Sequence, residues 1–465
     1  MERASRGGDM QKDLKAFFEP DGVAVVGASR EPNKIGYCVF KNFVDNFKGP
    51  VYPVNPNAAV ILKKICYPDV TEIPKPVDLA VLAIPAKQIP KVMEDCVKKK
   101  VKAVIIISAG FSEVGNKELE EKILHIAKKG KIRIIGPNCL GVYDTFSKVD
   151  TLFLPTVKLG RPKAGGISFI SQSGAVGSVV LDYLASEGLG ISKFISYGNA
   201  IDVNEIDLLE YLNEDDLTKV ICFYLEGTKD GRRMMEAARK IVKKKPILIL
   251  KGGRTKEGMH AVHSHTGSLA GDDAIYETAF KQCGMLRIEN LMDMFTFADA
   301  LATQPIPEGD RVQIVTNGGG FGVLATDAIV KEGLSLAQMS EKSRKKIKEL
   351  VPSYAIIGNP LDLIGDADMK RYEVALEALG SDPNVDSILC ILLFQTVSLQ
   401  PEVVRVVRGF ASKNLKPLVV CSGGGEYAQK LMKELKEGSV PVFDSPDVAA
   451  KALKCLVNYG KIKGL

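Results

Sequence analysis

Short apolar runs alternate with amphipathic stretches along the first third of the chain. The apolar runs lie at residues 22–26, 50–54, 79–83, 103–107 and 133–135. Between them, residues 91–100 and 117–129 place apolar side chains at helical spacing. Buried parallel strands read as continuous apolar runs and need crossover connections, usually helices, between them. The pattern therefore predicts an α/β domain with a parallel, doubly wound sheet.

Small and polar residues follow each of these predicted strands, and they gather at the carboxyl edge of the sheet, where such sheets bind ligands. Candidates for contact with a phosphate-bearing ligand there are Gly27, Ala28, Ser29, Lys34, Asn55, Pro56, Ile84, Pro85, Ser108, Ala109, Gly110 and Asn138. Gly27 does not open a full G-x-G-x-x-G pattern. Asn55 and Pro56 follow the second strand, where a dinucleotide-binding domain would carry an acidic residue that binds the ribose. NAD is therefore disfavoured, and coenzyme A (CoA) fits better. Lys34 either reaches a phosphate or is an exposed lysine near a helix start.

The rest of the chain contains one structural unit twice. Residues 170–177 align with 315–322, and at the same offset Asp182 falls on Asp327. Each copy predicts a strand, a turn of small and polar residues and a helix, whose bare N-terminal amides attract anions. The predicted phosphate-binding turns are Ser171, Gln172, Ser173 and Gly174 in one copy and Asn317, Gly318, Gly319 and Gly320 in the other. Two such turns could hold one phosphoryl group, although a glycine turn needed only for packing is the alternative for each.

Three of the four histidines, His260, His263 and His265, lie between Gly252 and Gly271, in an insertion that only the first copy carries. We expect a glycine-framed surface loop there, in which His265 is the nucleophile and the other two are spacers.

Glu226 follows the apolar strand 219–225 of the same copy, and the aligned position of the second copy is Phe394. A carboxylate that accepts a hydrogen bond from one imidazole nitrogen leaves the other free to attack, so Glu226 is the second catalytic candidate. The alternative is an exposed acid at the end of a strand.

The length of 465 residues suggests three domains, at 1–143, 144–303 and 304–465. With 25% charged residues and a net charge of +6, the composition is that of a soluble globular protein, and no nucleic-acid recognition motif is present. No apolar run reaches the ~20 residues that span a membrane, and the first residues carry no secretory signal. The nine cysteines are scattered without a CxxC pair, which indicates a reduced, cytoplasmic protein. We see no metal site.

Several motifs, taken together, resemble those of the alpha subunits of ADP-forming acetyl-CoA synthetases, which are acyl-CoA synthetases related to succinyl-CoA synthetase. The motifs are Gly27-Ala28-Ser29 with Lys34-Ile35-Gly36, Tyr52-Pro53-Val54-Asn55-Pro56, Gly136-Pro137-Asn138, Ser171-Gln172-Ser173-Gly174 and Ser264-His265-Thr266-Gly267-Ser268-Leu269-Ala270-Gly271. The resemblance covers nearly the whole chain, and the histidine motif is the most specific. It implies a Rossmann-like CoA-binding domain followed by two flavodoxin-like domains with parallel sheets.

The resemblance also implies a reaction. Acyl-CoA, ADP and phosphate would interconvert with an acid, ATP and CoA through an acyl phosphate and a phosphorylated His265 that Glu226 steadies. CoA or acetyl-CoA and phosphate would bind this chain. ADP or ATP with Mg²⁺ would bind a separate ATP-grasp beta subunit, often in an assembly of two alpha and two beta chains, because three domains use up all the residues. Ser178 lies near the position where succinate-using relatives carry an aromatic residue, so a dicarboxylate is not implied.

Three other interpretations stay open. A non-enzymatic, CoA-binding regulatory subunit on the same fold is the main alternative, and the intact histidine motif argues against it. A fused acyltransferase would need an acetyltransferase domain, for which no region remains. A nicotinamide oxidoreductase lacks the nucleotide fingerprint.

Overall fold

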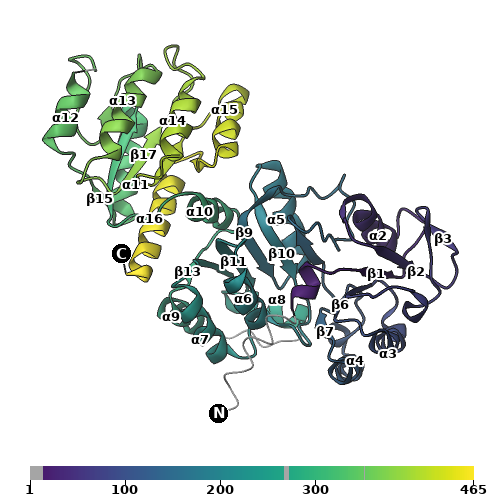
Figure 1. Cartoon of the computed structure of the whole chain (residues 1–465). Helices are drawn as coiled ribbons and strands as arrows, with labels where there is room; N and C mark the ends of the chain where they lie inside the picture. Colours follow the sequence, from purple (N-terminus) through teal and green to yellow (C-terminus); the bar gives the residue numbers. More distant parts are fainter. Residues whose placement is uncertain (1–13, 267–271, 350, 465) are drawn as a thin grey trace. The chain divides into compact units, whose positions relative to one another are not determined.

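The computed structural model describes residues 14–266, 272–349 and 351–464 (Figure 1). The chain divides into two compact units. One contains residues 14–186 and 190–287, and the other contains residues 187–189 and 288–464.

The first sheet of the first unit is parallel throughout and has the strand order β2-β1-β5-β6-β7. Its strands are β1 (Val23–Val26), β2 (Val51–Val54), β5 (Leu79–Leu82), β6 (Ala103–Ile106) and β7 (Arg133–Ile135). Helix α2 (Ile35–Asn46) covers one face, and α3 (Ile89–Lys99) and α4 (Lys117–Gly130) pack together on the other (Figure 1). The remaining short elements are β3 (Val60–Ile61), β4 (Lys64–Ile65), η1 (Val70–Glu72), η2 (Ala86–Gln88) and η3 (Ser112–Val114). The predicted doubly wound sheet is confirmed.

Two glycines fix the turn between β1 and α2. Gly27 has φ +89°, in the left-handed region that favours glycine. A Cβ on Gly36 would lie 1.9 Å from the carbonyl oxygen of Gly27, so no side chain fits there. The first turn of α2 can therefore lie directly on the end of β1.

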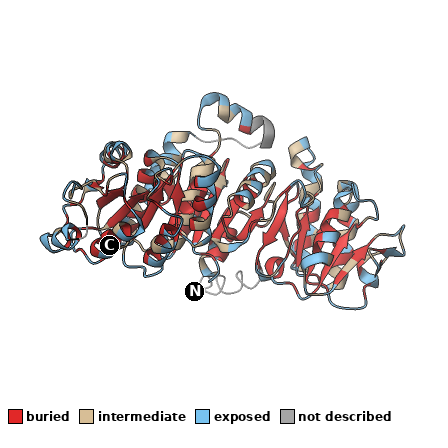
Figure 2. Ribbon diagram, turned by 90° about the horizontal axis from the view of Figure 1, so that it is seen from above, coloured by how far each residue is buried: buried red, intermediate tan, exposed pale blue. Residues whose placement is uncertain are grey.

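The second sheet of the first unit has the order β13-β12-β11-β9-β10-β8. Its parallel strands are β9 (Ala164–Ser171), β10 (Ile191–Ser196), β11 (Val220–Leu225), β12 (Ile247–Lys251) and β13 (Leu286–Arg287). At one edge β8 (Gly141–Asp144) runs antiparallel to β10. The helices are α5 (Gly174–Ser186), α6 (Glu205–Glu214), α7 (Gly231–Ile241), α8 (Lys256–Thr266) and α9 (Asp273–Cys283). Figure 2 shows the strands as largely buried and the outer faces of many helices as exposed.

Helix α8 corrects one prediction, because residues 256–266 are helical where we expected a loop. The hydroxyl of Thr255 accepts a hydrogen bond from the N–H of Gly258 at 3.0 Å, in the manner of an N-cap. Val262 is buried, and a Cβ on Gly253 would lie 2.9 Å from it. Residues 267–271, which complete the histidine motif, lie outside the described residues.

The second unit repeats the topology of the second sheet. Its sheet has the order β15-β14-β17-β18-β19, with β16 also beside β14, and every pair is parallel. The strands are β14 (Arg311–Thr316), β15 (Ser335–Leu336), β16 (Leu361–Asp362), β17 (Ser387–Ile391), β18 (Leu418–Cys421) and β19 (Val442–Phe443). The helices are α10 (Leu291–Thr303), α11 (Gly319–Lys331), α12 (Glu341–Lys348), α13 (Met369–Gly380), α14 (Val403–Ala411), α15 (Glu426–Glu437) and α16 (Pro446–Lys463).

The two copies differ where the sequence indicates an insertion. In the second copy β18 leads through α15 to β19, whereas in the first copy β12 leads through both α8 and α9 to β13. Helix α8, which carries the three histidines, is thus the additional element. The predicted division at 143 falls within β8, and α10 packs against α16 in the second unit. The three-domain division itself stays a prediction. Among the described residues, none of the helices is both long and apolar enough to cross a membrane.

Candidate functional site

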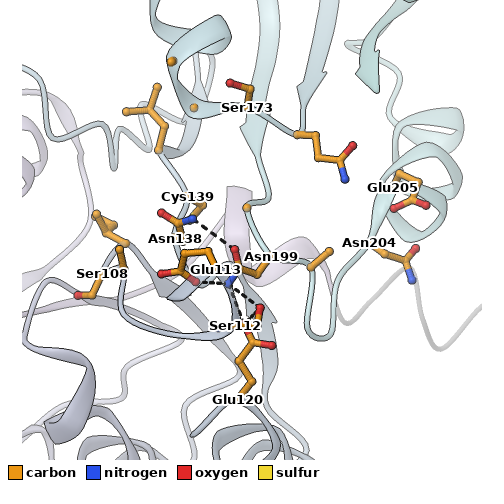
Figure 3. A pocket seen from close by; sticks show the side chains of 18 of the residues that line it. Ser108, Ser112, Glu113, Glu120, Asn138, Cys139, Ser173, Asn199, Asn204 and Glu205 are labelled. Carbon is orange, nitrogen blue, oxygen red and sulfur yellow. Dashed lines mark hydrogen bonds between the residues drawn. The ribbon is translucent and has the colours of Figure 1, made fainter. Parts of the chain in front are cut away.

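A pocket of about 1030 Å³ in the first unit brings together turns from its two sheets (Figure 3). Six of the predicted site residues line it: Ser108, Ala109, Asn138, Gln172, Ser173 and Gly174. Figure 3 shows Ser108 and Asn138 across the open space from Glu205. The volume is at the upper end of the range for small-molecule and cofactor sites.

The other first-domain candidates follow the strands β1, β2, β5 and β6 at the carboxyl edge but do not line this pocket. They are Gly27, Ala28, Ser29, Lys34, Asn55, Pro56, Ile84, Pro85 and Gly110. Asn55 donates a hydrogen bond from Nδ2 to the carbonyl of Ala28 at 2.8 Å, so it holds the first turn in place. Lys34 is exposed and lies 4.0 Å from Glu31, and its contact with a phosphate stays a prediction.

The turn between β9 and α5 is bound to the end of β11. The Gln172 Oε1 accepts hydrogen bonds from the backbone N–H groups of Glu226 at 2.7 Å and Gly227 at 3.2 Å. The hydroxyl of Ser173 accepts from the N–H of Val176 at 3.3 Å, inside the first turn of α5. The predicted phosphate turn and the predicted catalytic carboxylate are therefore neighbours.

Glu226 is buried, so it is not the exposed strand-end acid of the alternative interpretation. The hydroxyl of Tyr224 donates to its Oε1 at 3.4 Å, and burial together with this carboxylate raises the pKa of Tyr224 to about 12. A Cβ on Gly252 would lie 3.5 Å from the Cγ of Glu226. The segment that carries the histidines therefore leaves β12 beside the Glu226 side chain.

Lys251 is a buried cation at the same strand end. It pairs in register with Leu225, donates a hydrogen bond to the carbonyl of Gly252, and lies with Nζ 4.7 Å from the ring centre of Tyr276 on α9. Burial lowers its pKa, although the charges of Asp273 and Glu226 oppose that shift. Lys251 thus links the start of the segment after β12 to helix α9, and its charge offsets part of the buried negative charge of Glu226.

The three histidines lie on α8. His260 is exposed, and the side chains of His263 and His265 are outside the described residues. The predicted contact between His265 and Glu226 therefore stays a prediction.

The second predicted phosphate turn, at Asn317, Gly318, Gly319 and Gly320, joins β14 to α11 in the second unit. The side chain of Asn317 is buried and tied to the strand end after β17. Its Nδ2 donates to Leu393 O at 3.2 Å and to Thr396 Oγ1 at 3.1 Å, and its Oδ1 accepts from Leu393 N at 2.9 Å. That both turns hold one phosphoryl group stays a prediction.

Sequence reasoning missed a polar cluster on the pocket wall. The Nδ2 of Asn199 lies 2.7 Å from carboxylate oxygens of both Glu113 and Glu120, and the Nδ2 of Asn138 lies 3.3 Å from Asn199 Oδ1 (Figure 3). Burial raises the pKa of Glu113, but the hydrogen bonds from Asn199 and from three backbone N–H groups outweigh burial, so the net shift of the pKa is downward. The cluster joins the loop after β6 to the turn after β10. No group of three or more metal-ligating side chains occurs in the described part of the chain.

Comparison with known families matches almost the whole chain. A CoA binding domain matches residues 21–145, a succinyl-CoA ligase like flavodoxin domain matches residues 164–301, and a Ligase-CoA domain matches residues 312–451.

Three relatives illustrate the similarity. The alpha subunit of acetate–CoA ligase [ADP-forming] I from Pyrococcus furiosus is 43% identical, with 97% of this chain and 98% of that protein covered. The 4-hydroxybutyrate–CoA ligase [ADP-forming] of Nitrosopumilus maritimus is 35% identical, with 95% of this chain and 64% of that protein covered. A solved acetyl-coenzyme A synthetase 1 of Ca. Korarchaeum cryptofilum, in complex with phosphate and ADP, superimposes with a TM-score of 0.91 at 37% identity, with 97% of each chain covered.

Proposed function

Since the chain belongs to the alpha subunits of the ADP-forming acyl-CoA ligases, we propose that it catalyses the CoA and phosphoryl half of that reaction through a phosphohistidine at His265, with acetate as the acid. The observation that carries this proposal is the position of the buried Glu226. Its backbone is bound by Gln172 of the α5 turn, and its side chain lies beside Gly252, where the histidine segment begins.

The proposed reaction has three transfers. A phosphate oxygen attacks the thioester carbonyl carbon, the C–S bond breaks, and CoA leaves with a proton while an acyl phosphate remains. An imidazole nitrogen of His265 then attacks phosphorus, the P–O bond to the acyl group breaks, and the free acid leaves. Finally ADP accepts the phosphoryl group from His265, and ATP forms. Glu226 would hold the imidazole tautomer that leaves the attacking nitrogen unprotonated.

CoA would bind at the carboxyl edge of the first sheet and extend its thioester toward the pocket. The match to a CoA binding domain and the turns after β1, β2, β5 and β6 support this placement. Calorimetry on the full chain tests it, because CoA should bind with micromolar affinity and NAD should not. Binding of NAD alone would contradict it.

ADP, with Mg²⁺, would bind an ATP-grasp beta subunit in an assembly of two alpha and two beta chains in the cytoplasm. Two observations support a partner. The Pyrococcus furiosus relative is an alpha subunit, and the longer Nitrosopumilus maritimus relative contains a further third of sequence that this chain does not match. When this chain alone is given acetyl-CoA and inorganic phosphate, its histidine should become phosphorylated, but no ATP should form from ADP. Addition of the beta subunit should restore ATP formation.

The central test is incubation of the chain with acetyl-CoA and labelled inorganic phosphate, followed by detection of acid-labile label on the protein. His265→Ala should abolish the label, whereas His260→Ala, which changes an exposed residue of the same helix, should keep it. Glu226→Gln should slow labelling by roughly 10²-fold or more, as loss of an orienting carboxylate does. A chain that binds CoA but is never labelled would instead be the regulatory subunit of the alternative interpretation.

The acid is the finer part of the proposal, because relatives at this level of identity act on different acids. Ser178 lines the pocket and directs its hydroxyl to the carbonyl of Ala175 at 2.8 Å. A small side chain at this position leaves room beside the α5 turn. Labelling rates with acetyl-CoA, 4-hydroxybutyryl-CoA and succinyl-CoA would rank the acids, and acetyl-CoA should be fastest.

A further inference from the structure

Gln172 has a side-chain amide whose orientation is fixed by its neighbours. Its Oε1 accepts from two backbone N–H groups, those of Glu226 and Gly227, at 2.7 and 3.2 Å. An NH₂ group cannot accept these bonds, so the nitrogen must occupy the other branch of the amide. That Nε2 has no hydrogen-bond partner among the described residues, and Gln172 lines the pocket. Gln172 therefore brings to the pocket wall a fixed amide whose two N–H groups bind none of the described residues.

The duplicated unit provides an internal comparison. Asn317 occupies the equivalent position, and its Oδ1 accepts from the strand-end N–H of Leu393 at 2.9 Å, as Gln172 does with Glu226. Its nitrogen, however, is used within the protein, because it donates to Leu393 O and to Thr396 Oγ1. In the second copy the whole amide of Asn317 thus bonds the turn to the strand end. In the first copy the oxygen of Gln172 makes the corresponding bonds, and the N–H groups of its Nε2 stay available.

The charges around the pocket indicate what such donors would bind. Two lysines line it, Lys117 and Lys229. Five acidic side chains line it as well: Glu113, Glu120, Glu121, Glu205 and Asp230. An anionic substrate therefore gains little from the net charge of the wall and depends on donors at fixed positions.

We propose that the Nε2 of Gln172 donates hydrogen bonds to the tetrahedral phosphorus group in the pocket, first as inorganic phosphate and then as the acyl phosphate formed from it. This role rests on the proposed function. It makes Gln172 a residue that contacts the reacting phosphate, in addition to holding the backbone of Glu226. The bond-making steps stay those given above, and Gln172 exchanges no proton in them.

Two substitutions separate the proposed donor role of Nε2 from the hydrogen bonds that Oε1 accepts from Glu226 and Gly227. Gln172→Glu keeps an oxygen for the N–H groups of Glu226 and Gly227 but replaces the donors with a charged oxygen. Gln172→Met adds no charge but loses both the hydrogen bonds from Glu226 and Gly227 and the N–H donors. The loss of the donors is common to both, so both should raise the apparent KM for inorganic phosphate in the labelling reaction by about tenfold or more. Gln400→Glu makes the same change of charge at an exposed site and should leave the KM unchanged.

The outcomes are distinguishable. A raised KM in both variants, with thermal midpoints close to that of the wild type, supports the donor role. A raised KM in Gln172→Glu alone would show charge repulsion only, a raised KM in Gln172→Met alone would show that only the bonds to Glu226 and Gly227 matter, and either result, or an unchanged KM in both variants, would overturn it. Absence of label on the wild-type chain would instead overturn the proposed function, and this role with it.

Discussion

At the scale of single residues, two helical glycines differ in what a methyl group would meet. On Gly36 it would lie 1.9 Å from the carbonyl oxygen of Gly27, whereas on Gly409 of α14 it would meet nothing within 4 Å. Gly36→Ala must move backbone and should cost about 3 kcal/mol or more of unfolding free energy. Gly409→Ala should stabilise by about 0.5–1 kcal/mol, because glycine is a poor helix former. Denaturant titration of both variants is the measurement, and equal effects would contradict the packing argument.

Glu113 predicts a pH dependence. Its folded-state pKa lies below the unfolded value, since the bonds from Asn199 and the backbone outweigh the effect of burial. Its contribution to stability is therefore complete above the unfolded pKa of about 4.3 and is lost as the pH falls through the lower folded value. Glu113→Gln should remove this dependence, so its thermal midpoint should fall less than that of the wild type below about pH 4. Glu236→Gln, at an exposed site, serves as control and should behave like the wild type.

The residues of the site were predictable from the sequence to different degrees. The α5 turn and Glu226 follow apolar runs directly, so strand patterns alone place them at the same sheet edge. Asn199 and Glu113 are 86 residues apart in sequence, and only the packing of the two sheets brings them together. No local pattern marks such a pair.

At the scale of elements, α8 was missed because the glycines around it are conspicuous, while its helix-forming residues Lys256, Glu257 and Met259 are not. The strands of the first sheet, in contrast, were predicted almost to their ends, because β1, β5 and β6 are apolar throughout and fully buried.

Arg287 should anchor α9, the element to which the histidine segment returns. From β13 it makes two contacts to Asp273, at 2.7 and 2.9 Å, and one to Glu277 at 2.8 Å, and its side chain is 12% exposed. Arg287→Ala should cost about 1.5 kcal/mol or more, because it removes several charge-assisted hydrogen bonds.

The matched control is Arg232→Ala on α7, where the arginine side chain is 91% exposed and contacts Glu236 at 3.4 Å. An exposed ion pair of this kind contributes little, so this variant should stay within about 0.5 kcal/mol of the wild type. Chemical denaturation compares the two. If Arg232→Ala costs as much as Arg287→Ala, the anchoring role of Arg287 is wrong.

At the scale of the whole molecule, each unit has a core of its own. Leu379 belongs to the core of the second unit, and Ile123 belongs to a core of the first, and both are fully buried. Leu379→Ala and Ile123→Ala should each cost about 2–5 kcal/mol. In calorimetry, Leu379→Ala should lower the temperature of the transition of the second unit, and Ile123→Ala that of the first. An identical shift of the whole profile in both would mean that the chain unfolds as one cooperative unit.

The nine cysteines are all buried, which gives the protein a practical property. Thiol reagents attack thiolates, and burial raises the pKa of Cys96, Cys139 and Cys455 to about 12. The folded chain should therefore react slowly with maleimides. A fluorophore attached through Glu257→Cys, at an exposed position of α8, would then label one site selectively without removal of any native cysteine. Its emission could follow the histidine-bearing helix in real time as acetyl-CoA and phosphate are mixed in.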